Sequence, residues 1–187
     1  MSRTTHRAPR SVVTVLADGV RHDALAAEID AGTVPALAQL RDAGGLHAVS
    51  TVFPSVTGPA YAPFLMGRFP GAVGLPGLRW YDRARLRASW PDHCRSYVGV
   101  EMRHVDADID AGAPTAFELA PSALGAMNMI GRGLPREHRL GSGALFSLRA
   151  AAVHFRGDVR GWLRIDRDVA AAVAHHVRRH ASAFTFA

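Results

Sequence analysis

The stretch SVVTVLA (residues 11–17), followed by Asp18 and Gly19, decides the fold class of this chain. A continuous run of β-branched and apolar residues is typical of a strand that is buried on both faces, as in a parallel sheet. A glycine directly after such a strand allows the backbone to leave it sharply. We therefore predict a strand over residues 11–17, with the Asp18 carboxylate at the carboxyl edge of the sheet.

Helical and strand patterns alternate along the rest of the chain. The predicted helices have apolar residues at helical spacing, and the first two end at glycines. Strands that alternate with helices indicate an α/β sandwich with a largely parallel central sheet. The predicted helices are residues 21–32, 34–45, 61–66 and 166–180, and the further predicted strands are residues 47–53, 96–105 and 183–187.

Two segments between these elements have weaker patterns. Thr115 and Glu118 have the spacing of a capping box, which predicts the start of a short helix. Repeated glycines over residues 122–143 predict irregular structure, as in an insertion or a cap.

The composition is that of a globular protein with an arginine-rich surface. The chain has 187 residues, 48% of them hydrophobic, so it is long enough to bury a core. All 22 basic residues are arginine, and the net charge of +6 would attract phosphate-bearing ligands. A solvated arginine-rich surface is the favoured explanation of these arginines, and we do not expect a nucleic-acid partner. The single cysteine, Cys94, excludes a disulfide within the chain.

The amino-terminal residues do not have the pattern of a signal peptide. The apolar run that follows the basic first residues ends at Asp18, which is too short for a signal sequence. No later run approaches the roughly 18 apolar residues of a membrane-spanning helix. We therefore expect a cytoplasmic protein.

A second motif places a hydroxyl group between a predicted strand and a predicted helix. Residues 53–59, FPSVTGP, put Thr57 at this junction. Backbone N–H groups at a helix start can hold phosphate oxygens, and contact with a metal ion would favour the alkoxide of the threonine. A turn or helix-cap role explains both Asp18 and Thr57 as well, so the residues alone leave the alternatives open.

Taken together, the motifs resemble the type I phosphodiesterase/nucleotide pyrophosphatase branch of the alkaline phosphatase superfamily. Their order and spacing agree with that family over residues 11–82. The matching pieces are VVTVLADGV (12–20), VPALAQL (34–40), FPSVT (53–57) and MGRFPGAVG (66–74).

This resemblance implies a fold and an activity. The fold would be an alkaline-phosphatase-like three-layer α/β sandwich, with residues 1–187 forming a single partial domain. The activity would be metal-dependent hydrolysis of phosphodiester or pyrophosphate bonds in a small phosphate ester or nucleotide. Asp18 would bind one of two divalent metal ions, expected to be zinc. Thr57 would bind metal and attack phosphorus, which gives a covalent phospho-threonine intermediate.

The sequence departs from the family pattern in three ways. Ala60 stands where the family commonly has an asparagine, and Gly58 stands where it usually has an aromatic residue. The remaining metal ligands of the family come from its carboxyl-terminal half, and the second aspartate there follows a strand like AFTFA (183–187). We therefore expect the chain to be a fragment that needs this half for activity. The alternative is an inactive fragment or an anion-binding pseudoenzyme.

Other candidate sites have weaker patterns. Asp106, Asp108 and Asp110 alternate as in a calcium loop, but the positions that need glycine and an acid hold Ala111 and Phe117, so a solvated turn is favoured.

The aromatic and histidine clusters also have structural explanations. Trp80, Tyr81 and Trp90 lie among arginines and could stack on a base, although packing within an arginine-rich loop is favoured. His176 and His180 have the i, i+4 spacing of a helical zinc site, but the neighbouring arginines favour an exposed basic face.

Overall fold

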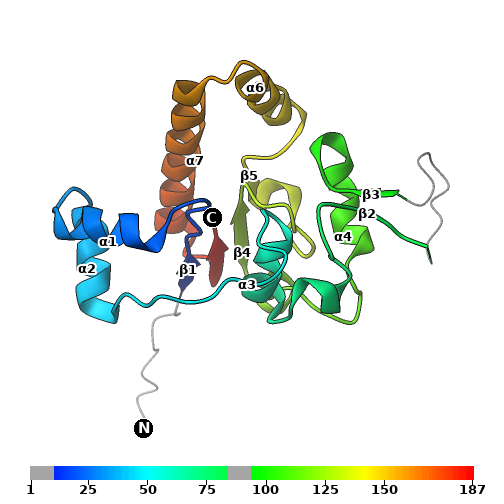
Figure 1. Ribbon diagram of the computed structural model, residues 1–187, viewed down its shortest axis with the longest axis horizontal. Coiled ribbons are helices and arrows are strands. Elements are labelled where there is room, and N and C mark those ends of the chain that lie inside the picture. Colours follow the sequence, from blue (N-terminus) through cyan, green and yellow to red (C-terminus); the bar gives the residue numbers. More distant parts are fainter. Residues whose placement is uncertain (1–10, 84–93) are drawn as a thin grey trace, which may run out of the picture.

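Four parallel strands form the central sheet. The computed structural model describes residues 11–83 and 94–187 (Figure 1). The strand order is β1-β6-β4-β5, and neighbouring strands pair in parallel. The mixed α/β fold with a parallel central sheet is thus confirmed. The strands are β1 (Val12–Thr14), β4 (Ala123–Ala126), β5 (Arg139–Leu140) and β6 (Phe184–Phe186).

Helices and a small second sheet surround these strands. An antiparallel pair, β2 (Arg79–Tyr81) and β3 (Cys94–Ser96), forms the second sheet. The α-helices are α1 (His22–Asp30), α2 (Pro35–Gly44), α3 (Ala62–Met66), α4 (Val105–Asp108), α5 (Ala116–Leu119), α6 (Ala144–Phe155) and α7 (Val159–His180). The 3₁₀ helices are η1 (Pro59–Tyr61), η2 (Pro70–Val73), η3 (Gly99–His104) and η4 (Arg136–His138).

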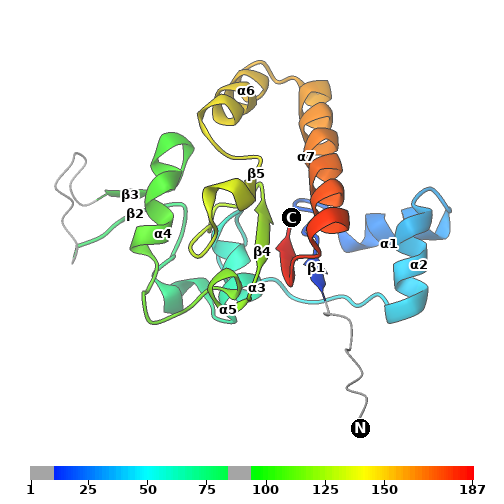
Figure 2. The same cartoon turned by 180° about the vertical axis from the view of Figure 1, so that it is seen from behind.

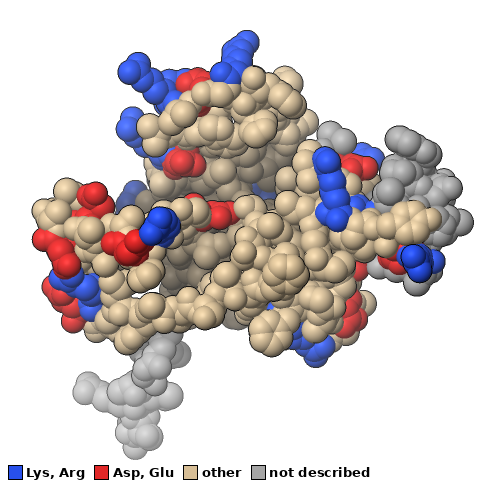
Figure 3. Space-filling view, in the orientation of Figure 1, with Lys and Arg blue, Asp and Glu red and all other residues tan. Residues whose placement is uncertain are grey.

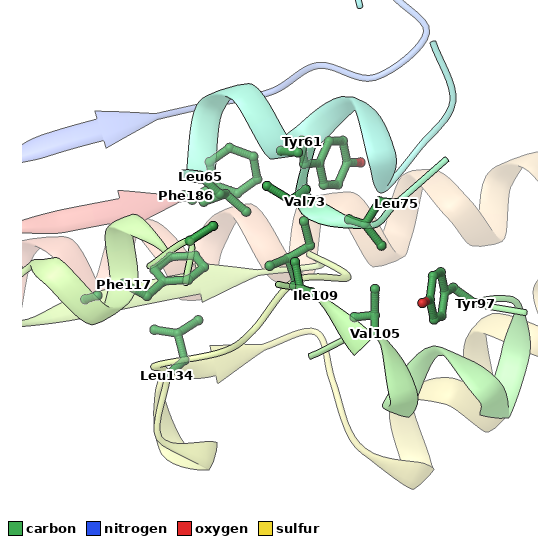
Figure 4. Packing of buried hydrophobic residues seen from close by; sticks show 14 residues of the cluster. Tyr61, Leu65, Val73, Leu75, Tyr97, Val105, Ile109, Phe117, Leu134 and Phe186 are labelled. Carbon is green, nitrogen blue, oxygen red and sulfur yellow. The ribbon is translucent and has the colours of Figure 1, made fainter. Parts of the chain in front are cut away.

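The main hydrophobic core lies between the sheet and the segment that contains α3. Phe186 packs against Tyr61 with ring centroids 5.7 Å apart, and Phe184 packs against Phe117 at 5.5 Å (Figure 4). Side chains alternate along a strand, so Thr185 points to the other face of the sheet. Helix α7 lies on that side, as the front and back views show (Figures 1 and 2).

All four predicted helices are present. Helices α1, α2 and α3 lie where the patterns predict them, α7 begins at Val159 and not at the predicted Asp166, and strand β6 forms within the predicted AFTFA segment. The capping box is also present, because the Thr115 hydroxyl accepts a hydrogen bond from the Glu118 N–H and the Glu118 carboxylate accepts one from the Thr115 N–H.

The predicted strand over residues 47–53 is wrong. The segment has no regular secondary structure and pairs with no strand among the described residues, and Phe53 is 92% exposed. The prediction for residues 11–17 is correct in position but not in burial. Val12 and Val13 are exposed because β1 lies at the edge of the sheet, where β6 is its one partner among the described residues.

Two other local predictions also need correction. Residues 96–105, expected to be a strand, mostly form the 3₁₀ helix η3. Residues 122–143, expected to be irregular, contain the fully buried strand β4 and the edge strand β5. The glycine in β4 has a packing role, because a Cβ atom on Gly125 would lie 2.5 Å from the Leu134 side chain.

The charges are distributed unevenly on the face that Figure 3 shows. Acidic side chains gather over α1 and α2, whereas arginines lie mainly around α6 and α7 and at scattered places elsewhere. On this face the arginines are spread over several elements rather than gathered in one stripe.

Candidate active site

Asp18 lies beyond the end of β1, at the carboxyl edge of the sheet. The Leu16 N–H donates a hydrogen bond to the Ala187 carbonyl over 2.7 Å. The contact between the two chain segments therefore continues beyond strands β1 and β6, to within two residues of Asp18. Asp18 and Gly19 then form a turn, and Gly19 has a φ of +80°, which favours glycine. The carboxylate therefore leaves the sheet where open α/β proteins bind their ligands.

Thr57 reaches the same place from a distant part of the sequence. The segment that follows α2 crosses to η1, and Thr57 lies just before that 3₁₀ helix. Its Oγ1 donates a hydrogen bond to Asp18 Oδ2 over 2.5 Å, although the two residues are 39 positions apart. Both side chains are exposed. The fold thus brings together the two residues that the motifs single out.

Tyr61 is a third member of this cluster, which the sequence analysis missed. Its hydroxyl donates to the same Asp18 Oδ2 over 3.3 Å, and the residue is only 7% exposed. Burial raises the pKa of Tyr61 to about 12, and the neighbouring Asp18 charge acts in the same direction. The phenol therefore remains a hydrogen-bond donor at neutral pH. No local sequence pattern singles it out, because Gly58, with a φ of +93°, interrupts any helical course between Thr57 and Tyr61.

Gly58 is needed by the turn that follows Thr57. Its φ of +93° and ψ of −74° are strained for any residue with a side chain. A Cβ atom there would lie 1.8 Å from Met129 Cε, which packs over the turn from the segment after β4. The absence of the family's usual aromatic residue at this position therefore has a local physical reason.

The comparisons with known proteins identify the family. The family model described as type I phosphodiesterase / nucleotide pyrophosphatase matches residues 12–115, which is more than half of the chain and includes Asp18 and Thr57. The chain belongs to this family. Neither a curated protein nor a solved structure matches it significantly. Membership implies hydrolysis of phosphodiester or pyrophosphate bonds in general, and the family is typically metal-dependent and acts on small phosphate esters or nucleotides.

The Asp18 carboxylate is chemically suited to a cation in this phosphodiesterase-family chain. In the described part of the chain, eight other carboxylates form ion pairs with arginine, whereas Asp18 forms none. Its partners are the neutral hydroxyl groups of Thr57 and Tyr61. The negative charge is thus not neutralised by a side chain, and carboxylate and hydroxyl oxygens both suit a divalent cation.

The described residues supply only part of a metal site. Residues 11–83 and 94–187 contain no group of three histidine, cysteine, aspartate or glutamate side chains placed to hold a metal ion. A zinc ion generally has four ligands. Asp18 and Thr57 therefore fit a metal as two oxygen donors, and further donors are needed from outside the described residues.

The backbone around Thr57 offers fewer donors to a phosphate than the sequence suggests. The predicted helix start is a 3₁₀ turn, in which the Ala60 N–H donates to the Val56 carbonyl and the Tyr61 N–H to the Gly58 carbonyl. These two N–H groups are therefore already used within the turn. The Ala60 side chain has no polar group to replace the family's asparagine.

The three alternating aspartates have separate structural partners. Asp106 accepts hydrogen bonds from the Gly131 N–H and from Arg139, Asp108 accepts one from the Tyr97 hydroxyl, and Asp110 accepts one from the Gly112 N–H. Each of the three carboxylates is therefore held by a different group of the fold.

The described aromatic residues near β2 also have packing roles. The Trp80 ring contacts the Tyr97 ring edge-on, with centroids 5.1 Å apart, and the buried Arg95 lies 3.5 Å from Asp82. Trp80 is thus half-buried and packs on Tyr97, whereas its neighbour Tyr81 is 62% exposed. Trp90 lies outside the described residues. Among the residues that the structure describes, no helix is long and apolar enough to cross a membrane.

The histidines of α7 form a small cluster with a residue from another element. The His176 ring lies 4.6 Å from His180 and 5.5 Å from His138 of η4, centroid to centroid, and its Nε2 is 3.1 Å from the Ser182 hydroxyl oxygen. The sequence analysis could not place His138, because only the tertiary fold brings it to α7. Burial lowers the pKa of His176, and charge on His180, His138 or His175 lowers it further.

This cluster predicts a pH-dependent stability. Because the pKa of His176 is lower in the folded than in the unfolded chain, the unfolded chain binds the proton more readily. We expect the stabilising contribution to be complete above the ordinary histidine pKa of about 6.5 and to be lost as the pH falls below it. When the pH is lowered from about 7.5 to about 5.5, the melting temperature of His176→Gln should therefore fall less than that of the wild type.

The matched control is His22→Gln on the exposed start of α1. Thermal unfolding monitored by circular dichroism checks the prediction. If His176→Gln and the wild type lose the same melting temperature on acidification, the role assigned to His176 is wrong.

Proposed function

We propose that this chain provides the nucleophile and the first metal ligand of a phosphodiester or pyrophosphate hydrolase. The observation that supports this most strongly is the hydrogen bond between Thr57 Oγ1 and Asp18 Oδ2 at the carboxyl edge of the sheet. Family membership and the absence of an arginine partner for Asp18 in the described part of the chain point the same way.

In the proposed reaction, Thr57 Oγ1 attacks the phosphorus atom of the substrate. A bond forms between Oγ1 and phosphorus, the hydroxyl proton is released to water, and the bond to the leaving alcohol or phosphate breaks in line with the attack. Asp18 Oδ2 accepts the hydrogen bond of the hydroxyl group and so orients the oxygen before attack. Water then cleaves the phospho-threonine, which releases the product and restores the hydroxyl group.

Asp18 and Thr57 are the residues that would hold a divalent metal ion, and we propose zinc. A bound cation would stabilise the alkoxide of the threonine and the negative charge that develops on the phosphoryl oxygens. In this proposal, two ions act together, and the donors missing from the described residues come from elsewhere in the complete site. The substrate is a small phosphate ester or a nucleotide.

The alternative is a protein that binds anions without turning them over. The lack of a three-donor metal cluster within residues 11–83 and 94–187 favours this alternative. It predicts less than one bound zinc ion per chain and no turnover, whereas the hydrolase predicts both metal binding and turnover.

One assay separates the two functions. Bis(4-nitrophenyl) phosphate is incubated with the chain, with and without added zinc, and release of nitrophenol is followed by absorbance while bound zinc is quantified by mass spectrometry. The hydrolase predicts a zinc-dependent release that a chelator abolishes and added zinc restores. Absence of release at saturating zinc, together with phosphate binding, would instead establish the anion-binding protein.

A further inference from the structure

The hydroxyl group of Tyr61 reaches the oxygen atom on which the proposed chemistry depends. Thr57 and Tyr61 both donate to Asp18 Oδ2, over 2.5 Å and 3.3 Å. In the described part of the chain, these two are the side chains that hydrogen-bond to the Asp18 carboxylate. The carboxylate is exposed and belongs to a turn, so these two hydrogen bonds restrict the rotation of the Asp18 side chain.

The core fixes the position of this hydroxyl group. The Tyr61 ring is tilted at 59° to the Phe186 ring with centroids 5.7 Å apart, and it lies beside Leu65 and Phe186 in the packed cluster (Figure 4). Phe186 belongs to β6, the strand that pairs with β1, which leads to Asp18. The same sheet therefore positions both the carboxylate and the phenol that donates to it.

A carboxylate that binds a metal ion is held in position by a rigid hydrogen-bond donor of this kind. Groups that hydrogen-bond to a metal ligand orient it, and their loss weakens metal binding even though they do not touch the metal. A phenol is well suited to this role, since it donates a hydrogen bond without bringing a charge that would compete with the cation. Ala60 has no polar side chain, so Tyr61 is the next residue after Thr57 that can donate from its side chain.

We propose that Tyr61 is a positioning residue, which holds Asp18 Oδ2 in the orientation needed to bind a divalent cation beside Thr57. This inference rests on the proposed function and adds to it a residue that lies outside the four motifs matched above. Tyr61 acts through Asp18 and does not itself contact the reacting atoms.

A merely structural explanation is that the Tyr61 ring is buried for packing and that Asp18 accepts the hydrogen bond of its hydroxyl group. A buried hydroxyl group needs such a partner. The two explanations differ in what they predict for metal affinity. A packing role affects stability alone, whereas a positioning role affects the affinity of the chain for the cation.

The test compares Tyr61→Phe with the matched variant Tyr97→Phe. Tyr97 is also buried, at 1% exposure, and its hydroxyl also donates to a carboxylate, Asp108 Oδ2, over 3.0 Å, but it lies outside the site. Zinc affinity is measured by competition with a chromophoric chelator, and thermal stability is measured in parallel. We expect Tyr61→Phe to weaken zinc binding about tenfold and Tyr97→Phe to leave it unchanged.

Three results would overturn the inference. Unchanged zinc affinity in Tyr61→Phe would show that the hydroxyl does not position Asp18. An equal loss of zinc affinity in Tyr61→Phe and Tyr97→Phe would show that removing any buried tyrosine hydrogen bond has this effect. Asp18→Asn serves as the reference variant. If Asp18→Asn leaves zinc affinity unchanged, the proposed function fails together with the inference. If Asp18→Asn loses much zinc affinity and Tyr61→Phe loses none, the inference alone is refuted.

Discussion

Thr57→Ala is expected to lower zinc-dependent diester hydrolysis by roughly 10⁴-fold or more, because it removes the atom that attacks phosphorus. The folded structure should survive this change. Thr57 is exposed, and its hydroxyl contacts Asp18 rather than the core. The rate of nitrophenol release from bis(4-nitrophenyl) phosphate measures the effect, and circular dichroism verifies folding.

Two control variants sharpen this experiment. Thr57→Ser keeps a hydroxyl group and should retain a measurable rate. Thr33→Ala removes another exposed threonine whose hydroxyl donates to a carboxylate, that of Glu28, away from the site, and it should have no effect. Thr57→Ala with the wild-type rate would rule out Thr57 as the nucleophile.

Asp18→Asn is expected to weaken zinc binding on the order of 100-fold. Replacing a residue that only supports a metal ligand already lowers metal affinity, and replacing a ligand itself should lower it at least as much. The amide has nearly the size of the carboxylate but lacks its negative charge, which provides most of the attraction for the cation. The effect on stability should be small, because Asp18 is exposed and forms no ion pair within the described residues. Chelator competition gives the affinity, and thermal unfolding gives the stability.

Asp23→Asn is the matched control for this second experiment. Asp23 is an exposed carboxylate nearby in the sequence, but it is paired with Arg21 at the start of α1. Its replacement should leave zinc affinity unchanged. Equal zinc affinities for Asp18→Asn and the wild type would exclude Asp18 as a metal ligand.

The elements that the sequence predicted correctly are those that local patterns determine. Helices α1 and α2 have apolar spacing and glycine ends, and the capping box at Thr115 satisfies backbone groups within four residues. A strand differs, because it needs a partner elsewhere in the chain. Residues 47–53 have strand composition but no partner among the described residues, so they form no regular secondary structure and remain largely exposed.

Strand β4 shows the opposite error. The glycines around it suggest irregular structure, yet Gly125 is a glycine because the Leu134 and Asn128 side chains lie where its Cβ atom would be. A single sequence does not distinguish a glycine required by packing from one required by a turn. The inner strand β4 was therefore missed, although its neighbour β6 and the edge strand β1 were found.

The residues of the candidate site also differ in whether the sequence alone could indicate them. Asp18 and Thr57 are recognisable because each belongs to a motif with a local signature, and the structure places them in contact. Tyr61 has no such signature, since its role depends on the direction in which Phe186 and the core hold its ring. The fit of Met129 over Gly58 likewise depends on the tertiary fold, because 71 positions separate two residues that the structure packs together.

The most direct test of the central claim is to trap the covalent intermediate. The chain is mixed with zinc and bis(4-nitrophenyl) phosphate, quenched in acid during turnover, digested and mapped by tandem mass spectrometry. The account predicts a nitrophenyl-phosphoryl group on the Thr57 hydroxyl that is absent without zinc and absent from Thr57→Ala. Continued turnover with an unmodified Thr57, or with the group on another residue, would contradict it.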